Sequence, residues 1–189
     1  MSNLFSPELN MTEIVEHEVK SENVIEKKVI DKMDMKIRIE KYSLLPRTGG
    51  EWSGEAGNSE WIPNDDVEPG DRNGTNRGHK TWAEIKKEYE FNSIPFDEGK
   101  PDFSEVTKGE VEIDDFTDDR DSNFSQADEK LAEQRGCTPE EVEKWRAENK
   151  YTWHECKDCK TMKKVPTEVH GNISHSGGIS EYKFQQKTA

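Results

Sequence analysis

The fold of this chain is decided by residues 151–178, which read YTWHECKDCKTMKKVPTEVHGNISHSGG. Residues 151–153 and 162–165 are expected to form β-strands, since aromatic and β-branched side chains suit a pleated, half-buried surface. Pro166 ends the second strand, and Thr167 can cap a short helix that carries His170. The order of strand, turn, strand and short helix predicts a small finger.

Three of the five histidines and two of the three cysteines lie in this finger. The predicted topology brings His154, at the end of the first strand, near His170 and His175 on the helix and its exit. Convergent imidazoles with a carboxylate beside them are suitable ligands for a divalent metal. On a regular strand His154 and Glu155 point to opposite faces, so one can face a metal and the other water.

Such a site has a specific chemical use. A metal on one side of a phosphodiester stabilises the developing charge and the leaving 3′ oxygen, while a neighbouring base takes a proton from the attacking water. Histidine is the usual base, and a glutamate can serve if burial raises its pKa. The residues therefore point to phosphodiester hydrolysis.

The finger contains five short motifs, each present once: Trp153-His154-Glu155, Lys160-Thr161-Met162, Val165-Pro166, Val169-His170 and His175-Ser176-Gly177-Gly178. Together they resemble the WHH family, a branch of the HNH/endonuclease VII nuclease superfamily found as C-terminal toxin modules of bacterial polymorphic secretion systems. The resemblance implies a ββα-metal (HNH-like) finger, a DNA substrate, and a cognate immunity protein in the producing cell. It also implies a divalent metal cofactor, with Mg²⁺, Mn²⁺, Ni²⁺ and Zn²⁺ all open.

The family's residues carry over one by one. His154 matches the first histidine of the motif, His170 the helical one and His175 the last, which makes these three the implied metal ligands. Glu155 stands where the family has a second histidine, and similarity would make it the general base. The alternative makes His154 the base and leaves the metal to Glu155, His170 and His175. We favour His154 as the base, because it is the paired residue that this sequence retains.

Three lysines flank the proposed site, namely Lys160, Lys163 and Lys164. They could contact substrate phosphates, or equally solvate a thin two-stranded ribbon.

A non-catalytic reading competes with the nuclease. Cys156 and Cys159 with His170 and His175 have the spacing Cys-x2-Cys-x10-His-x4-His, which is close to a structural zinc site. The chain would then be a zinc-stapled binding module. That reading leaves His154 and Glu155, the core of the resemblance, without a role.

Upstream of the finger, local signals predict short helices and one strand. Thr81 and Glu84 form a capping box for a helix that runs to about residue 90, and a strand is expected near 111–113. Ser125 and Asp128 form a second capping-box pattern for a helix predicted at 125–135, with Gly136 as its C-cap. Thr138 and Glu141 form a third, for a helix predicted at 139–149, and both helices are expected to be a back wall for the finger. The fold class is therefore α+β, with long polar loops upstream.

The chain divides into three parts by composition. Residues 1–45 are expected to be an N-terminal arm or the remnant of an upstream domain, and residues 46–80 a linker rich in Gly, Pro and Asp. Residues 81–189 are the expected toxin nuclease domain. Trp52 and Trp61 are expected to pin the linker onto the folded part.

Charge and hydropathy restrict the partners. The formal net charge is -14, but the acids concentrate at 96–130, and basic residues outnumber acidic ones from residue 150 onward. We therefore expect DNA at the basic C-terminal end and an immunity protein with an acidic surface. No apolar run is long enough for a membrane span, and no signal peptide is recognisable. We expect synthesis in a bacterial cytoplasm and delivery into a target cell by a dedicated secretion system.

Overall fold

The computed structural model describes residues 27, 44–71 and 74–188. The arm expected at residues 1–45 lies almost entirely outside the described residues. The compact unit of interest is Leu44–Ala189. Within the described residues, no helix is long and apolar enough to cross a membrane.

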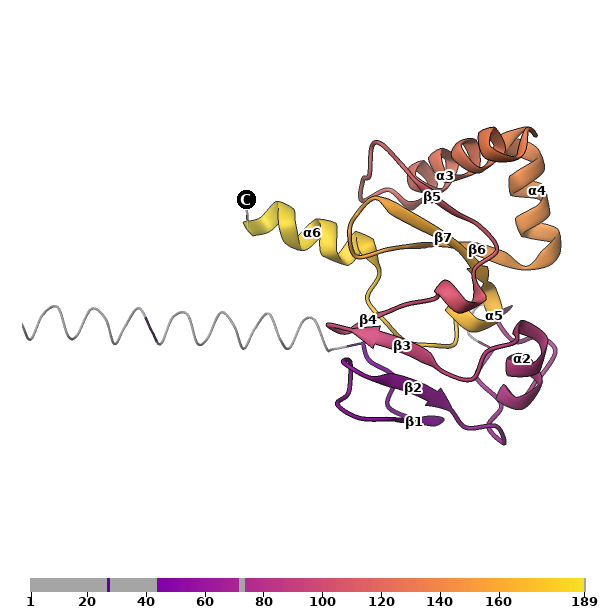
Figure 1. The fold of residues 1–189 in the computed structure, drawn as a ribbon, viewed down its shortest axis with the longest axis vertical. Helices are drawn as coiled ribbons and strands as arrows, with labels where there is room; N and C mark the ends of the chain where they lie inside the picture. The colour runs from indigo at the N-terminus through magenta and orange to yellow at the C-terminus, as the bar shows by residue number, and fades with distance from the viewer. Residues whose placement is uncertain (1–26, 28–43, 72–73, 189) are drawn as a thin grey trace, which may run out of the picture. The chain divides into compact units, whose positions relative to one another are not determined.

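The first sheet of this unit has four short antiparallel strands in the order β1-β2-β3-β4. The strands are β1 (Gly50–Trp52), β2 (Glu60–Pro63), β3 (Ile94–Asp97) and β4 (Lys100–Pro101) (Figure 1). Residues 46–80 were expected to be a linker, but β1 and β2 form a hairpin within this range. Trp52 lies opposite Trp61 in register, with ring centroids 5.3 Å apart, and also packs on Phe96 at 4.9 Å. These aromatic contacts hold strands that are too short to carry an alternating pattern in the sequence.

Helix α2 (Trp82–Tyr89) connects the second and third strands, and its capping box is confirmed. The Thr81 backbone N–H donates to the Glu84 carboxylate at 2.8 Å, and the Glu84 backbone N–H donates to the Thr81 hydroxyl at 3.4 Å. Trp82 and Ile85 are its buried residues. The local signal was therefore sufficient to place this helix.

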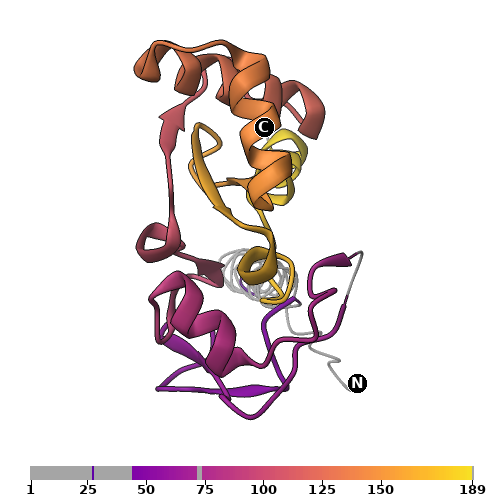
Figure 2. The same ribbon diagram turned by 90° about the vertical axis from the view of Figure 1, so that its right-hand side faces the viewer.

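The second sheet contains the predicted finger strands and has the order β5-β7-β6. Its strands are β5 (Glu110–Glu112), β6 (Tyr151–Glu155) and β7 (Thr161–Pro166), all antiparallel. Helices α3 (Arg120–Arg135) and α4 (Pro139–Asn149) pack against it (Figures 1 and 2), and the shared core includes Val111, Leu131, Val142, Trp153 and Met162. The α+β class and the two finger strands are confirmed.

Helix α3 begins earlier than the sequence predicted. Its N-cap is Asp119 rather than Ser125, because the Asp119 carboxylate accepts hydrogen bonds from the backbone N–H groups of Asp121 and Ser122. The predicted C-cap at Gly136 is confirmed, with a left-handed φ of 66°. At α4, Thr138 and Glu141 form the predicted capping box.

The finger ends in α5 (Thr167–His170), a single turn, and is followed by α6 (Gly178–Thr188), which the sequence did not predict. A short 3₁₀ helix, η2 (Ser104–Val106), follows β4. The residue just before it, Phe103, becomes important at the site.

Candidate metal centre

Three histidines from different parts of the finger converge. His154 lies on β6, His170 ends α5, and His175 lies in the loop before α6. Their candidate ligand atoms all lie within 4.8 Å of one another. His154 Nδ1 is 3.2 Å from His170 Nε2, so these two nitrogens share a hydrogen bond. The structure therefore brings together the three residues that the sequence singled out as metal ligands.

Phe103 forms an apolar wall against this histidine cluster, defined as His154, His170 and His175. Its side chain is fully buried, and its ring centroid lies 4.9 Å, 5.6 Å and 5.4 Å from those of the three histidines in chain order. An aromatic ring in contact with all three imidazoles limits their movement and excludes water from that side. Sequence reasoning missed Phe103, because it lies in an acidic loop about 50 residues before the finger and matches no motif.

Hydrogen bonding leaves at least one nitrogen ready to coordinate. His175 Nδ1 lies 2.7 Å from the backbone carbonyl of Ile173. A carbonyl only accepts, so Nδ1 carries the proton and the lone pair resides on Nε2. Such a hydrogen bond on the far nitrogen is the usual way in which proteins orient metal-binding histidines.

The cluster is held in the neutral form that binds metals. Burial lowers the pKa of His154 and of His170 well below the ordinary value of 6.5, and the neighbouring imidazole of His175 lowers both further. Burial also lowers the pKa of His175 to about 4. Because a metal binds the unprotonated imidazole, the donor set fits a divalent ion at neutral pH.

Glu155 lies on the opposite face of β6, away from the cluster. It is buried, and its Oε2 lies 3.6 Å from the Arg120 guanidinium, while Oε1 has no hydrogen-bond partner among the described residues. Burial raises the pKa of the Glu155 carboxyl, and Arg120 partly offsets this effect. Among the described residues, Glu155 is therefore not grouped with His170 and His175, and which residue of the His154–Glu155 pair acts as the base stays a prediction.

The two finger cysteines do not join the cluster. Among the residues that the structure describes, the group that could hold a metal consists of histidines alone. The Cys159 thiol lies 3.6 Å from the backbone carbonyl of Gly178, and burial raises the pKa of Cys156 to about 12. Because neither cysteine sulfur belongs to that group, the geometry disfavours the Cys-x2-Cys-x10-His-x4-His reading.

The three lysines expected at the substrate have different surroundings. Lys163 pairs in register with His154 and donates to Asp102 at 2.7 Å, and Lys160 forms an exposed ion pair with Glu112 at 2.5 Å. Lys164 is fully buried, with its ammonium 4.0 Å from the ring centroid of Trp145. Burial lowers its pKa to about 8. Lys164 therefore packs against Trp145 and does not reach a phosphate from this position.

Residues 94–177 match the family model of the DNase/tRNase domain of colicin-like bacteriocin. The match supports a nuclease toxin domain, and it spans the histidine cluster, Phe103 and Glu155. A search of curated proteins found no match.

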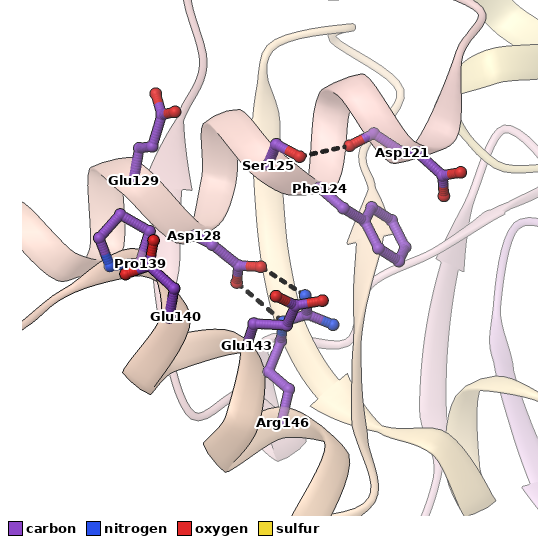
Figure 3. Close-up of a pocket in the computed structure, with 9 residues that line it drawn as sticks. All are labelled: Asp121, Phe124, Ser125, Asp128, Glu129, Pro139, Glu140, Glu143 and Arg146. Carbon is purple, nitrogen blue, oxygen red and sulfur yellow. Dashed lines mark hydrogen bonds and ion pairs between the residues drawn. The ribbon is translucent and has the colours of Figure 1, made fainter.

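A hollow between α3 and α4 has a lining unlike that of the histidine cluster (Figure 3). The residues that line it are mainly acidic: Asp121, Phe124, Ser125, Asp128, Glu129, Pro139, Glu140, Glu143 and Arg146. The Asp128 carboxylate accepts hydrogen bonds from the Arg146 guanidinium and, at 2.8 Å, from the Trp153 indole N–H. An acidic lining repels phosphate, so this hollow is not a surface for DNA.

Proposed function

We propose that this chain is a metal-dependent endonuclease that cleaves DNA phosphodiester bonds, as the toxin module of an interbacterial system. The observation that carries the proposal is the cluster of three neutral imidazoles within 4.8 Å of one another, inside the stretch that matches the bacteriocin nuclease family. His154 is buried and His170 and His175 are half-buried, so these imidazoles lose hydration, and a bound metal would offset that cost.

The geometry supports a division of roles among these residues. His154, His170 and His175 would hold the divalent ion, and Phe103 would keep their spacing. When bound, the ion supplies positive charge for the phosphate and the leaving 3′ oxygen. Its identity stays open among Mg²⁺, Mn²⁺, Ni²⁺ and Zn²⁺.

Glu155 is our candidate for the general base. Burial raises the pKa of its carboxyl, and the buried Oε1 has no hydrogen-bond partner among the described residues, so it would serve as the proton acceptor once substrate and water enter the site. Arg120 beside it is 62% exposed at the side chain, which leaves its guanidinium able to contact a phosphate. Lys163, on the same face of the sheet as His154, and the exposed Lys160 are further candidates for phosphate contacts.

The finer assignment to the WHH branch rests on the motifs of the finger. It brings with it an immunity protein that blocks the site and delivery into the cytoplasm of a target cell. We expect the immunity protein to present acidic side chains to the basic finger.

Plasmid cleavage tests the proposal. The chain is incubated with supercoiled DNA and Mg²⁺, Mn²⁺, Ni²⁺ or Zn²⁺ in turn, with EDTA as a blank. The His154→Ala variant is compared with His79→Ala, which removes an exposed histidine that hydrogen-bonds Glu68 outside the cluster. Nicking that requires metal, survives His79→Ala and disappears in a folded His154→Ala protein supports the nuclease. Nicking that His154→Ala leaves unchanged contradicts the assigned centre.

A further inference from the structure

Helix α5 carries His170 but has little stability of its own. It consists of four residues, and Pro166 at its N-terminus provides no side-chain cap. Helices this short do not persist in water without tertiary contacts, because the cost of ordering the first turn is not recovered. The position of the His170 imidazole therefore depends on what holds α5 from outside.

What holds α5 is a segment that precedes the family match. The Glu168 side chain, only 4% exposed, accepts a hydrogen bond from the Lys80 ammonium at 2.7 Å and from the Tyr89 hydroxyl at 3.1 Å. Lys80 lies just before α2 and Tyr89 is its last residue, and α2 lies beside α5 (Figures 1 and 2), more than 75 residues away in the chain. Both contacts end on the same carboxylate oxygen, two residues before His170.

The other end of α5 is held by the same upstream segment. The Thr75 hydroxyl donates to the Asn172 side-chain carbonyl at 3.1 Å, and the Asn172 amide donates to the backbone carbonyl of Glu168 at 2.8 Å. At Gly171 a Cβ atom would lie 2.3 Å from the Thr75 methyl group, so the backbone packs directly on that side chain. Lys80 and Tyr89 therefore contact α5 before His170, and Thr75 contacts the two residues that follow it.

The loop that supplies these groups is itself ordered from within. The buried Asn76 side chain donates to the backbone carbonyls of Pro69 and Lys80, and it accepts from the Lys80 backbone N–H. Burial alone would lower the pKa of Lys80, but its hydrogen bonds to Glu168 and Glu88 outweigh that effect and raise it. The ammonium is therefore charged when it meets the buried carboxylate.

We infer that Thr75, Lys80 and Tyr89 form a clamp, the α5 clamp, that positions His170 for metal binding. These are positioning residues, because none of them touches the histidine cluster. The inference rests on the proposed function for the metal, and it extends the working unit upstream of residue 94, where the family match begins. A fragment that starts at residue 94 would contain every metal ligand and still lack the clamp.

The test compares two lysines that each bind a carboxylate, only one of which belongs to α5. Lys80→Met removes the clamp cation, whereas Lys86→Met removes a cation on α2 that binds the Pro63 carbonyl and Asp65 instead of α5. Tyr89→Phe removes only the second hydrogen bond to Glu168. Binding of Co²⁺ or Ni²⁺ by the full chain is measured by visible absorption and calorimetry, and amide hydrogen exchange over residues 167–172 is measured without metal.

We expect Lys80→Met to weaken metal binding by roughly tenfold, in the range known for outer-shell partners, and Tyr89→Phe to weaken it by a few-fold. Exchange over 167–172 should accelerate in Lys80→Met and stay near wild type in Lys86→Met. Equal changes in metal affinity and exchange for the two lysine variants would overturn the clamp, since they would report general destabilisation. If the wild-type chain binds no metal, the proposed function fails and the role toward metal fails with it, while the exchange data still decide whether the clamp orders α5.

Discussion

His154 and Glu155 are consecutive on β6, and their side chains lie on opposite faces of the sheet. The His154 imidazole is 3.2 Å from His170, whereas the Glu155 carboxylate is 3.6 Å from Arg120. Alternation along a strand thus places two buried titratable groups in separate surroundings only one residue apart. The first is held neutral among other imidazoles, and the second has a raised pKa beside a guanidinium. This separation allows metal binding and proton transfer to be tested independently.

Glu155→Gln is expected to lower the rate of DNA cleavage by about 10²- to 10⁴-fold, the usual contribution of a general base. Its metal affinity should stay within about twofold of wild type, because Glu155 lies outside the cluster. His154→Ala should lose both DNA cleavage and metal binding. Calorimetric metal titration and single-turnover nicking measure the two properties. Loss of metal binding in Glu155→Gln would instead support the alternative ligand set that contains Glu155.

The metal-free protein should lose stability as the pH falls from about 6.5 to about 4. In that window the unfolded chain protonates its histidines, while the folded cluster stays neutral because burial lowers each pKa. For His175, a pKa lowered from 6.5 to about 4 corresponds to about 3 kcal/mol.

Urea unfolding in EDTA at several pH values measures this loss. The His175→Asn variant should show a smaller decline over the same window, and His79→Asn should decline as wild type does. Parallel curves for wild type and His175→Asn would show that the cluster does not exclude protons.

Cys156→Ala and Cys159→Ala should leave metal stoichiometry and affinity unchanged, since the cluster among the described residues consists of histidines alone. A modest loss of stability, on the order of 1 kcal/mol, is expected from the packing of these partly buried thiols. Metal analysis after dialysis and a thermal melt check both properties. Loss of bound metal in either variant would restore the zinc-stapled module as the better description.

Asp128→Ala should destabilise the fold by about 3–5 kcal/mol, because it leaves Arg146 without its buried ion pair and Trp153 without its acceptor. Arg146 is only 12% exposed at the side chain, so water cannot replace the carboxylate fully. The neighbouring exposed Glu129, changed to Ala, serves as the control and should alter stability by less than about 0.5 kcal/mol. Urea denaturation separates the two, and equal midpoints would contradict the importance of the buried pair.

Several elements were predictable because their signals are local. The capping boxes at Thr81 and Thr138 and the C-cap at Gly136 need only a few neighbouring residues, and the structure has all three. Helix α3 shows the limit of such reasoning. Two acceptable N-caps stand within six residues, and hydrogen bonds to Asp119 rather than Ser125 decide the start. The hairpin of β1 and β2 was missed because its strands are too short for a periodic signal.

The sequence by itself determined the order of strands and short helix in the finger, and it singled out the three histidines that meet there. It did so because strand and helix preferences act over a few residues, and a strand–turn–strand–helix order leaves few ways to arrange its ends. Only the tertiary structure decided the rest of the site. Phe103 meets the histidine cluster and Lys80 meets Glu168 across long stretches of chain. Such pairs are selected by packing and by the need to satisfy buried polar groups, and neither requirement leaves a spacing in the sequence that can be read.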